Sequence, residues 1–304
     1  MPPTLAGAPG PPKKAAAVAG TGRGRLLSSV PNVAAATLLA LVDATPSGPA
    51  WARGWVEGAL APLVPKLRTV FGGCGLHGWS VGTVIGDEPL AQSRPVARAE
   101  DDPLDDLLRV PGRCIVAALD TRTPDPSAVS ARPAGGVHRF RRFLSLRAQP
   151  ELPPPLAKRL AAELPEYLAR GRRDRPDAEL VLLSFIAELQ SLGGLSQRYA
   201  TAEQIQDALI RLDARMTGTD AHHFMVTDGR TLGVLARGGT LLAFDAPEDA
   251  PRLGIGLSMV HPGPAARLLV ALPGDDVGPD VAAERIADGC LTIEAAAPWR
   301  MQRA

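Results

Sequence analysis

The chain is short of several residue types that mark specialised protein classes. Aromatic residues make up only 4% of its 304 residues, and its three cysteines are too few and too far apart for a disulfide framework or a zinc cluster. Lysine plus arginine (33) balances aspartate plus glutamate (32), and a net charge of +1 offers no field that would attract nucleic acid or an anionic membrane. No apolar run reaches the length of about 18 residues that a membrane-spanning helix needs. We therefore expect a globular protein of a reducing, cytoplasmic compartment, with neither nucleic acid nor membrane as a partner.

Glycine and proline are plentiful, with 31 and 30 residues, and many of them lie near the N-terminus. Residues 1–32 are rich in Pro, Gly and Ala and carry four basic residues without an acid. Such a segment buries too little surface to offset its ordering entropy, so we predict a flexible basic tail followed by one domain over residues 33–304. Val33–Val42 has the length of a signal-peptide core, but Asp43 follows at once, which favours a buried strand or a short helix.

Strand patterns lie on both sides of a helical middle part. The middle part has apolar residues at every fourth position of Pro153–Arg170, where Pro165 predicts a bend, and a second apolar helix over Asp177–Leu192 with Asp177 as its cap. Thr201-Ala-Glu-Gln204 is a capping-box pattern that predicts the start of a third helix. Strands before, helices between and strands after predict an α+β fold rather than alternating βαβ units.

Short apolar runs and turn residues mark the strands. The expected strands are Leu76–Ile85, Arg113–Leu119, His222–Thr227, Thr231–Arg237, Thr240–Phe244, Ile255–Val260, Arg267–Leu272 and Leu291–Glu294. Asp228-Gly229 and Gly238-Gly239 are typical hairpin turns between three of them.

The segment FMVTDGRTLGVLAR (Phe224–Arg237) resembles the N-F-L-x-S-D-G-x-x-L-x-A-T-R hairpin of class II glutamine amidotransferases, and most closely that of their small bacterial members. Other segments are similar to motifs of that family and follow its order: Leu76–Gly82, Ile115–Leu119, Arg175–Glu179 and Glu284–Glu294. The resemblance covers residues 33–298. It implies the fold of an N-terminal-nucleophile (Ntn) hydrolase, a four-layer αββα sandwich of two antiparallel sheets flanked by helices.

The resemblance also implies a catalytic cysteine at the mature N-terminus, whose own α-amine serves as the base. The strand that should begin with this cysteine is Ala36-Thr37-Leu38, which contains none. Thr37 is a weak candidate for a nucleophile after proteolytic cleavage, and Cys74 is another, since cleavage after Gly73 would expose it.

The family's substrate pocket is altered as well. Asp120 stands where the family has the arginine that grips the substrate carboxylate, with Arg122 two residues further on. Gly135 beside Gly136 replaces the oxyanion asparagine, a kind of donor whose loss costs about 100-fold or more in rate. Asp177 matches the aspartate that receives the substrate amine. We therefore predict a ligand pocket from the residues Asp177, Arg122, Trp79, Gly135 and Gly136, without metal or cofactor.

These losses predict a degenerate amidotransferase-like domain that acts as a non-catalytic regulatory, ligand-sensing or protein-interaction module. The alternative is a glutamine or amide hydrolase that is activated when its N-terminal segment is removed. An amino-acid-like ligand is expected, and a protein partner could dock on the basic clusters Arg139–Arg142 and Arg170–Arg173. His222-His223 does not predict a metal site, because neighbouring residues of a strand point to opposite faces.

Overall fold

The computed structural model describes fourteen parts of the chain, all within the unit Ala34–Ala304. They are residues 37–43, 58–59, 78–85, 87–94, 107, 109–110, 112–120, 136–148, 151–170, 177–217, 222–245, 266–272, 283–286 and 288–294. The predicted tail over residues 1–32 and the predicted strand Ile255–Val260 lie outside them. In the described residues, no helix is both long and apolar enough to cross a membrane.

The strands form two sheets, and all their pairings are antiparallel. Sheet A contains β1 (Thr37–Asp43), β2 (Gly78–Ile85), β3 (Glu88–Arg94), β4 (Cys114–Asp120), β9 (Thr240–Asp245), β10 (Ala266–Leu272) and β11 (Glu284–Ile286), in the order β11-β9-β10-β1-β4-β2-β3. Sheet B contains β5 (His138–Phe140), β6 (Phe143–Arg147), β7 (His222–Thr227), β8 (Thr231–Arg237) and β12 (Gly289–Glu294), in the order β12-β8-β7-β6-β5.

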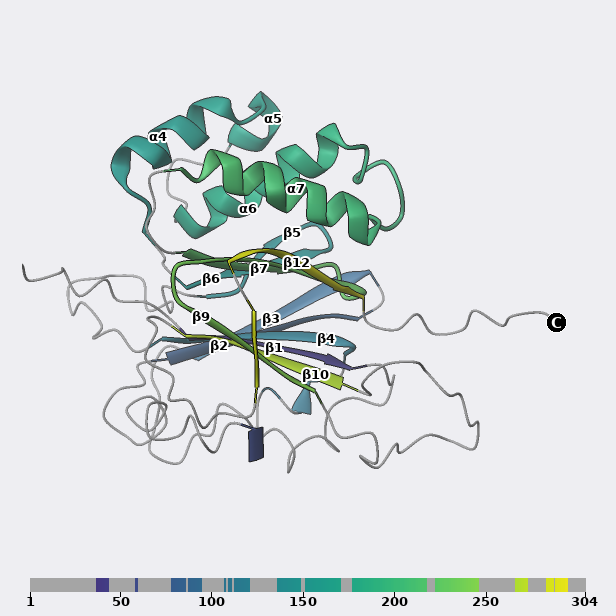
Figure 1. Cartoon of the computed structure of the whole chain (residues 1–304). Helices are drawn as coiled ribbons and strands as arrows, with labels where there is room; N and C mark the ends of the chain where they lie inside the picture. Colours follow the sequence, from purple (N-terminus) through teal and green to yellow (C-terminus); the bar gives the residue numbers. More distant parts are fainter. Residues whose placement is uncertain are drawn as a thin grey trace, which may run out of the picture. The chain divides into compact units, whose positions relative to one another are not determined.

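Sheet B lies between sheet A and a layer of helices (Figure 1). The helices are α4 (Pro154–Glu163), α5 (Glu166–Ala169), α6 (Asp177–Ser191) and α7 (Ala202–Arg215). Their apolar side chains share one cluster with Phe143, Phe224 and Leu235 of sheet B. The predicted α+β class with two antiparallel sheets is confirmed. Among the described residues, α4 to α7 form one helical layer, and the second layer of the αββα sandwich stays a prediction.

Alternation along the strands decides which side chains fill the space between the sheets. In β1, Leu38, Ala40 and Val42 belong to the core cluster that also contains Leu144 and Met225 of sheet B. The sheets approach closely at Gly82 of β2. A Cβ atom there would lie 2.8 Å from Cγ1 of Val137, the residue that precedes β5, and 3.1 Å from Cδ1 of Leu144.

Local sequence signals explain where the helices begin and end. Pro165 separates α4 from α5, as predicted, because proline cannot donate the backbone hydrogen bond that a continuous helix requires. The capping box of α7 is also confirmed. The hydroxyl of Thr201 accepts a hydrogen bond from the amide of Gln204 at 3.1 Å, and Oε1 of Gln204 accepts one from the amide of Thr201 at 3.0 Å.

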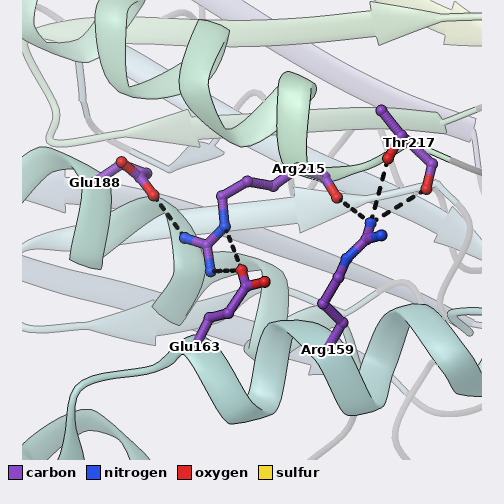
Figure 2. A network of polar contacts seen from close by, with 5 residues as sticks. All are labelled: Arg159, Glu163, Glu188, Arg215 and Thr217. Atoms are coloured by element: carbon purple, nitrogen blue, oxygen red, sulfur yellow. Dashed lines mark hydrogen bonds and ion pairs between the residues drawn. The ribbon is translucent and has the colours of Figure 1, made fainter.

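One guanidinium links three helices of the layer (Figure 2). Arg215 of α7 bonds Oε1 of Glu188 in α6 at 2.6 Å and Oε2 of Glu163 in α4 at 2.6 Å. Arg159 of α4 donates to the backbone oxygen of Arg215 at 2.6 Å and also reaches Thr217. The helices are therefore joined by polar contacts as well as by their apolar cluster.

The edge strand β3 and the hairpin of β5 and β6 were not predicted from the sequence. β3 has no alternating apolar pattern, because six of its seven residues are exposed and it is the last strand at its edge of sheet A. The hairpin of β5 and β6 lies in a stretch that the sequence presents as a basic cluster. Its pairing with β7 buries every residue of β6, including Arg147.

Candidate functional site

One end of the sandwich, where β1 and β2 begin, holds several of the predicted site residues. Thr37 of β1 and Trp79 of β2 both pair with Leu119 of β4, so the three residues form one row across the sheet. Residues of one row share a face, and Thr37 alternates with Leu38, which faces sheet B. Thr37 and Trp79 therefore face the outer side of sheet A, where they are 3% and 2% exposed.

The described cysteines do not provide a nucleophile at this end or elsewhere. Burial raises the pKa of the Cys114 thiol, which lies between the sheets, to about 12. Burial also raises the pKa of Cys290 to about 11. Both remain thiols at neutral pH, whereas the nucleophilic form of cysteine is the thiolate. Cys74 lies outside the described residues.

A buried cation lies in sheet B, at the end of the sandwich where β1 and β2 begin. Arg147 ends β6 and alternates with Leu144 and Leu146, which face sheet A, so its side chain faces the helices. It is 2% exposed, and its Nη1 donates to the backbone oxygen of Glu151 at 3.2 Å. Its Nε has no hydrogen-bond partner among the described residues. Burial lowers the pKa of Arg147 to about 10 against the opposing effect of Asp177, which leaves the guanidinium charged at neutral pH.

Asp177 lies within electrostatic reach of this cation. It is the first residue of α6, whereas the sequence predicted it at the capping position before the helix. Its Oδ2 accepts a hydrogen bond from the amide of Leu152 at 2.9 Å, which ties the start of α6 to the segment that follows β6. The structure thus brings Asp177 together with Arg147, a residue that the sequence did not single out.

Other predicted pocket residues are separate from this pair or outside the described parts. Gly136 is buried and lies two residues before β5. Arg122 and Gly135 fall outside the described residues. Thr37 and Trp79 belong to the outer face of sheet A, whereas Arg147 and Asp177 lie on the helical side of sheet B.

A neutral imidazole, that of His222, lies near the Arg147 side chain. His222 at the start of β7 faces the helices, and its Nε2 lies 3.5 Å from Oδ1 of Asp213, which is paired in turn with Arg237. Burial, helped by the charges of Arg147 and Arg237, lowers the pKa of His222 to about 4 against the attraction of Asp213. Burial lowers the pKa of His223 too, although its side chain faces the other side of the sheet.

At this end of the sandwich, the buried guanidinium of Arg147 lies near the carboxylate of Asp177, so opposite charges lie close together away from bulk water. A guanidinium with an unused Nε donor can bind a carboxylate, and a neighbouring carboxylate can receive an ammonium group. Arg147 was missed because the sequence places it after three other arginines, which predict a solvent-exposed basic cluster. The available signal was the alternation of FLSLR (Phe143–Arg147), in which Arg147 takes the same face as the apolar Phe143.

The predicted basic clusters are only partly free on the surface. Arg139 and Arg141 are exposed, but Arg142 donates to the backbone oxygens of Gln197 and Gly194 at 3.2 and 3.4 Å. Arg170 pairs with the exposed Glu166 at 2.8 Å. The remainder of the second cluster lies outside the described residues.

No protein-family model matches the sequence, and no curated protein matches it. Among solved structures, the chain is similar to a predicted glutamine amidotransferase from Pseudomonas aeruginosa PA01 with a TM-score of 0.48 and 12% identity, over 86% of this chain and 98% of the other. It is also similar to a glutamine phosphoribosylpyrophosphate amidotransferase from B. subtilis complexed with ADP and GMP (TM-score 0.45, 12% identity, 85% of this chain). A third similar structure is described as the allosteric regulatory enzyme of purine biosynthesis (TM-score 0.44, 11% identity, 85% of this chain). The chain spans about half, 49%, of the length of each of these last two.

Proposed function

We propose that this chain is a non-catalytic module with an amidotransferase-like fold that senses a small amino-acid-like ligand. The position of Thr37 carries the proposal. A nucleophile must contact its substrate, but the hydroxyl-bearing residue at the start of β1 faces the outer side of sheet A, whereas Asp177 lies on the helical side of sheet B. Together with the predicted loss of the pocket arginine and asparagine, this placement argues against amide hydrolysis.

Arg147 and Asp177 supply the binding chemistry in this proposal. A free amino acid carries one carboxylate and one ammonium group, which match the guanidinium and the carboxylate in sign. Leaving a buried donor without a partner costs about 1–3 kcal/mol, so a ligand oxygen that reaches Nε of Arg147 would recover part of that free energy. Asp177 would keep its bond to the amide of Leu152 through Oδ2.

A thermal-shift screen of amino acids and their amides tests the ligand. We expect a saturable rise in the melting temperature of the parent protein that Asp177→Asn abolishes, because asparagine can still accept from the Leu152 amide but carries no charge. Asp207→Asn, a change of the same kind on the exposed face of α7, is the control and should respond like the parent. If no amino acid or amide shifts the parent, the ligand-sensing role is wrong.

Intact mass and ammonia release test the absence of catalysis. We expect the purified chain to keep its full mass and to release no ammonia from glutamine above a boiled control. The alternative hydrolase requires trimming that exposes Thr37 or Cys74. Turnover that is lost on Thr37→Ala or Cys74→Ala would replace the non-catalytic proposal with that enzyme.

A further inference from the structure

Three arginines surround one tyrosine at the other end of the sandwich. The guanidinium of Arg230 lies 3.4 Å from the centre of the Tyr199 ring, and those of Arg198 and Arg142 lie 5.5 and 5.6 Å from it. Arg230 belongs to the turn between β7 and β8, Arg142 to the turn between β5 and β6, and Arg198 and Tyr199 to the connection between α6 and α7. Segments that are distant in sequence therefore bring positive charge to one point.

A single carboxylate offsets this charge. Asp87, in the turn between β2 and β3, accepts a hydrogen bond from the hydroxyl of Tyr199, and its Oδ2 lies 3.1 Å from Nη2 of Arg198. Within the described parts of the chain, neither Arg142 nor Arg230 pairs with an acid. Among the groups that touch the ring, three guanidinium groups and one carboxylate leave two positive charges. The buried Asp228, in the same turn as Arg230, accepts hydrogen bonds from the backbone amides of Arg230 and Thr231.

The cluster is partly fixed and partly open to solvent. Arg142 is held by its bonds to the backbone oxygens of Gly194 and Gln197, in the segment that leads to Tyr199. Arg230 is exposed and stacked on the ring, and the side chain of Arg198 is 77% exposed. Stacking orders the Arg230 guanidinium while its N–H groups stay unused by the described residues. Less side-chain entropy is then lost when an anion binds.

This cluster is distinct from the end that holds Arg147 and Asp177. Gly229 in the β7–β8 turn packs against Val84, next to the last residue of β2, so Arg230 and Asp87 lie where these strands end. Arg147 and His222 lie where β6 ends and β7 begins, at the far end of sheet B. A ligand at Tyr199 therefore does not depend on the proposed amino-acid site.

We propose that Arg142, Arg198 and Arg230 form with Tyr199 a binding site for a dianionic phosphate group, either free or carried by a larger molecule. Guanidinium forks match the oxygens of phosphate, and the net charge of the cluster matches a dianion. The charge is concentrated around one ring instead of running along a surface, and the chain as a whole carries only +1, so the cluster favours a compact anion over a nucleic-acid backbone.

Calorimetric titration with inorganic phosphate at constant ionic strength, with chloride as the reference anion, tests this site. We expect saturable binding to the full chain, weakened about tenfold by Arg230→Gln through the loss of one charge-assisted contact. Lys158→Gln removes the same charge from the exposed face of α4 and should leave the dissociation constant unchanged. A parallel titration with O-phosphoserine separates the two sources, because tighter binding of this probe indicates a phosphoryl group on a larger molecule.

Asp87→Asn distinguishes a binding site from a purely structural contact. Removing the carboxylate frees Arg198 and raises the charge around Tyr199, so phosphate should bind more tightly even if the variant is less stable. The proposal is overturned if phosphate does not bind the parent saturably. It is equally overturned if Arg230→Gln and Lys158→Gln weaken binding alike, or if Asp87→Asn leaves the affinity unchanged or weaker.

Discussion

Thr37 and Trp79 lie in a single cross-strand row, one on each side of Leu119, and both face away from sheet B. Any reaction at the Thr37 hydroxyl would therefore occur on the outer face of sheet A. Asp177 lies on the helical side of sheet B, so two sheets separate the candidate nucleophile from the candidate amine receptor.

Replacing Arg215 with methionine should loosen the helical layer. Methionine keeps an apolar stem but leaves Glu163 and Glu188 without their shared cation, and the Arg215 and Glu188 side chains are only 20% and 17% exposed. We expect the free energy of unfolding to fall by about 1–3 kcal/mol, less than for a fully buried pair, because Glu163 is 44% exposed. Urea denaturation measures the loss.

Arg170→Met is the matched control for that experiment. The Arg170 and Glu166 side chains are 76% and 83% exposed, and such surface pairs contribute about 0.5 kcal/mol or less. Similar losses in the free energy of unfolding for the two variants would show that Arg215 stabilises the protein no more than an exposed ion pair does.

Acid should destabilise the protein through His222. The unfolded histidine takes up a proton near pH 6.5, whereas the folded one resists it down to about pH 4 because of burial. The unfolded state thus holds more protons between these values, and stability is lost as the pH falls through this window. The loss is at most about 3 kcal/mol and ends below about pH 4, where both states are protonated.

Urea midpoints of the parent and of His222→Gln between pH 7 and pH 4 isolate this effect. Carboxylates titrate in both proteins, so their contribution cancels in the difference. The free energy of unfolding of the parent minus that of the variant should fall by up to about 3 kcal/mol as the pH falls, since glutamine does not titrate. Parallel curves would mean that His222 titrates with the same pKa in the folded and the unfolded protein.

Gly229→Ala should be more damaging than Gly193→Ala, although both glycines have positive φ, +86° and +77°. A Cβ atom on Gly229 would lie 2.6 Å from Cβ of Val84, whereas one on Gly193 would meet nothing closer than Oγ of Ser196 at 3.9 Å. Backbone strain costs about 1–2 kcal/mol in both variants, and the clash adds about 1–3 kcal/mol in the first. Equal melting temperatures would show that the turn can shift away from Val84.

The sequence predicted those parts of the fold that are determined by residues close together in the chain. Pro165 breaks a helix, and Thr201 with Gln204 starts one, wherever the rest of the chain lies. The strand β3 escaped prediction because it has little apolar surface to bury and is held by pairing with β2. The strand β6 owes its burial to β7 and to helices that come later in the chain.

The candidate sites depend even more on distant residues. Whether Arg147 is a surface charge or a buried one is decided by the helices that cover sheet B, whereas the alternation of FLSLR shows only that Arg147 shares a face with Phe143. The Tyr199 cluster combines four separate segments, and the hairpin motif around Arg230 gives no sign of the other three. In contrast, the opposite orientation of His222 and His223 followed from strand alternation alone.

Because the sheets approach closely at Gly82, substitutions at positions 82 and 137 depend on each other. A methyl group at position 82 would need the space that Cγ1 of Val137 occupies, so side-chain volume can be exchanged between the two positions but not added at both. A lineage that gains a side chain at position 82 should therefore carry a smaller residue at position 137. In distant relatives, these two residues should vary as a pair, although they lie 55 positions apart in the chain.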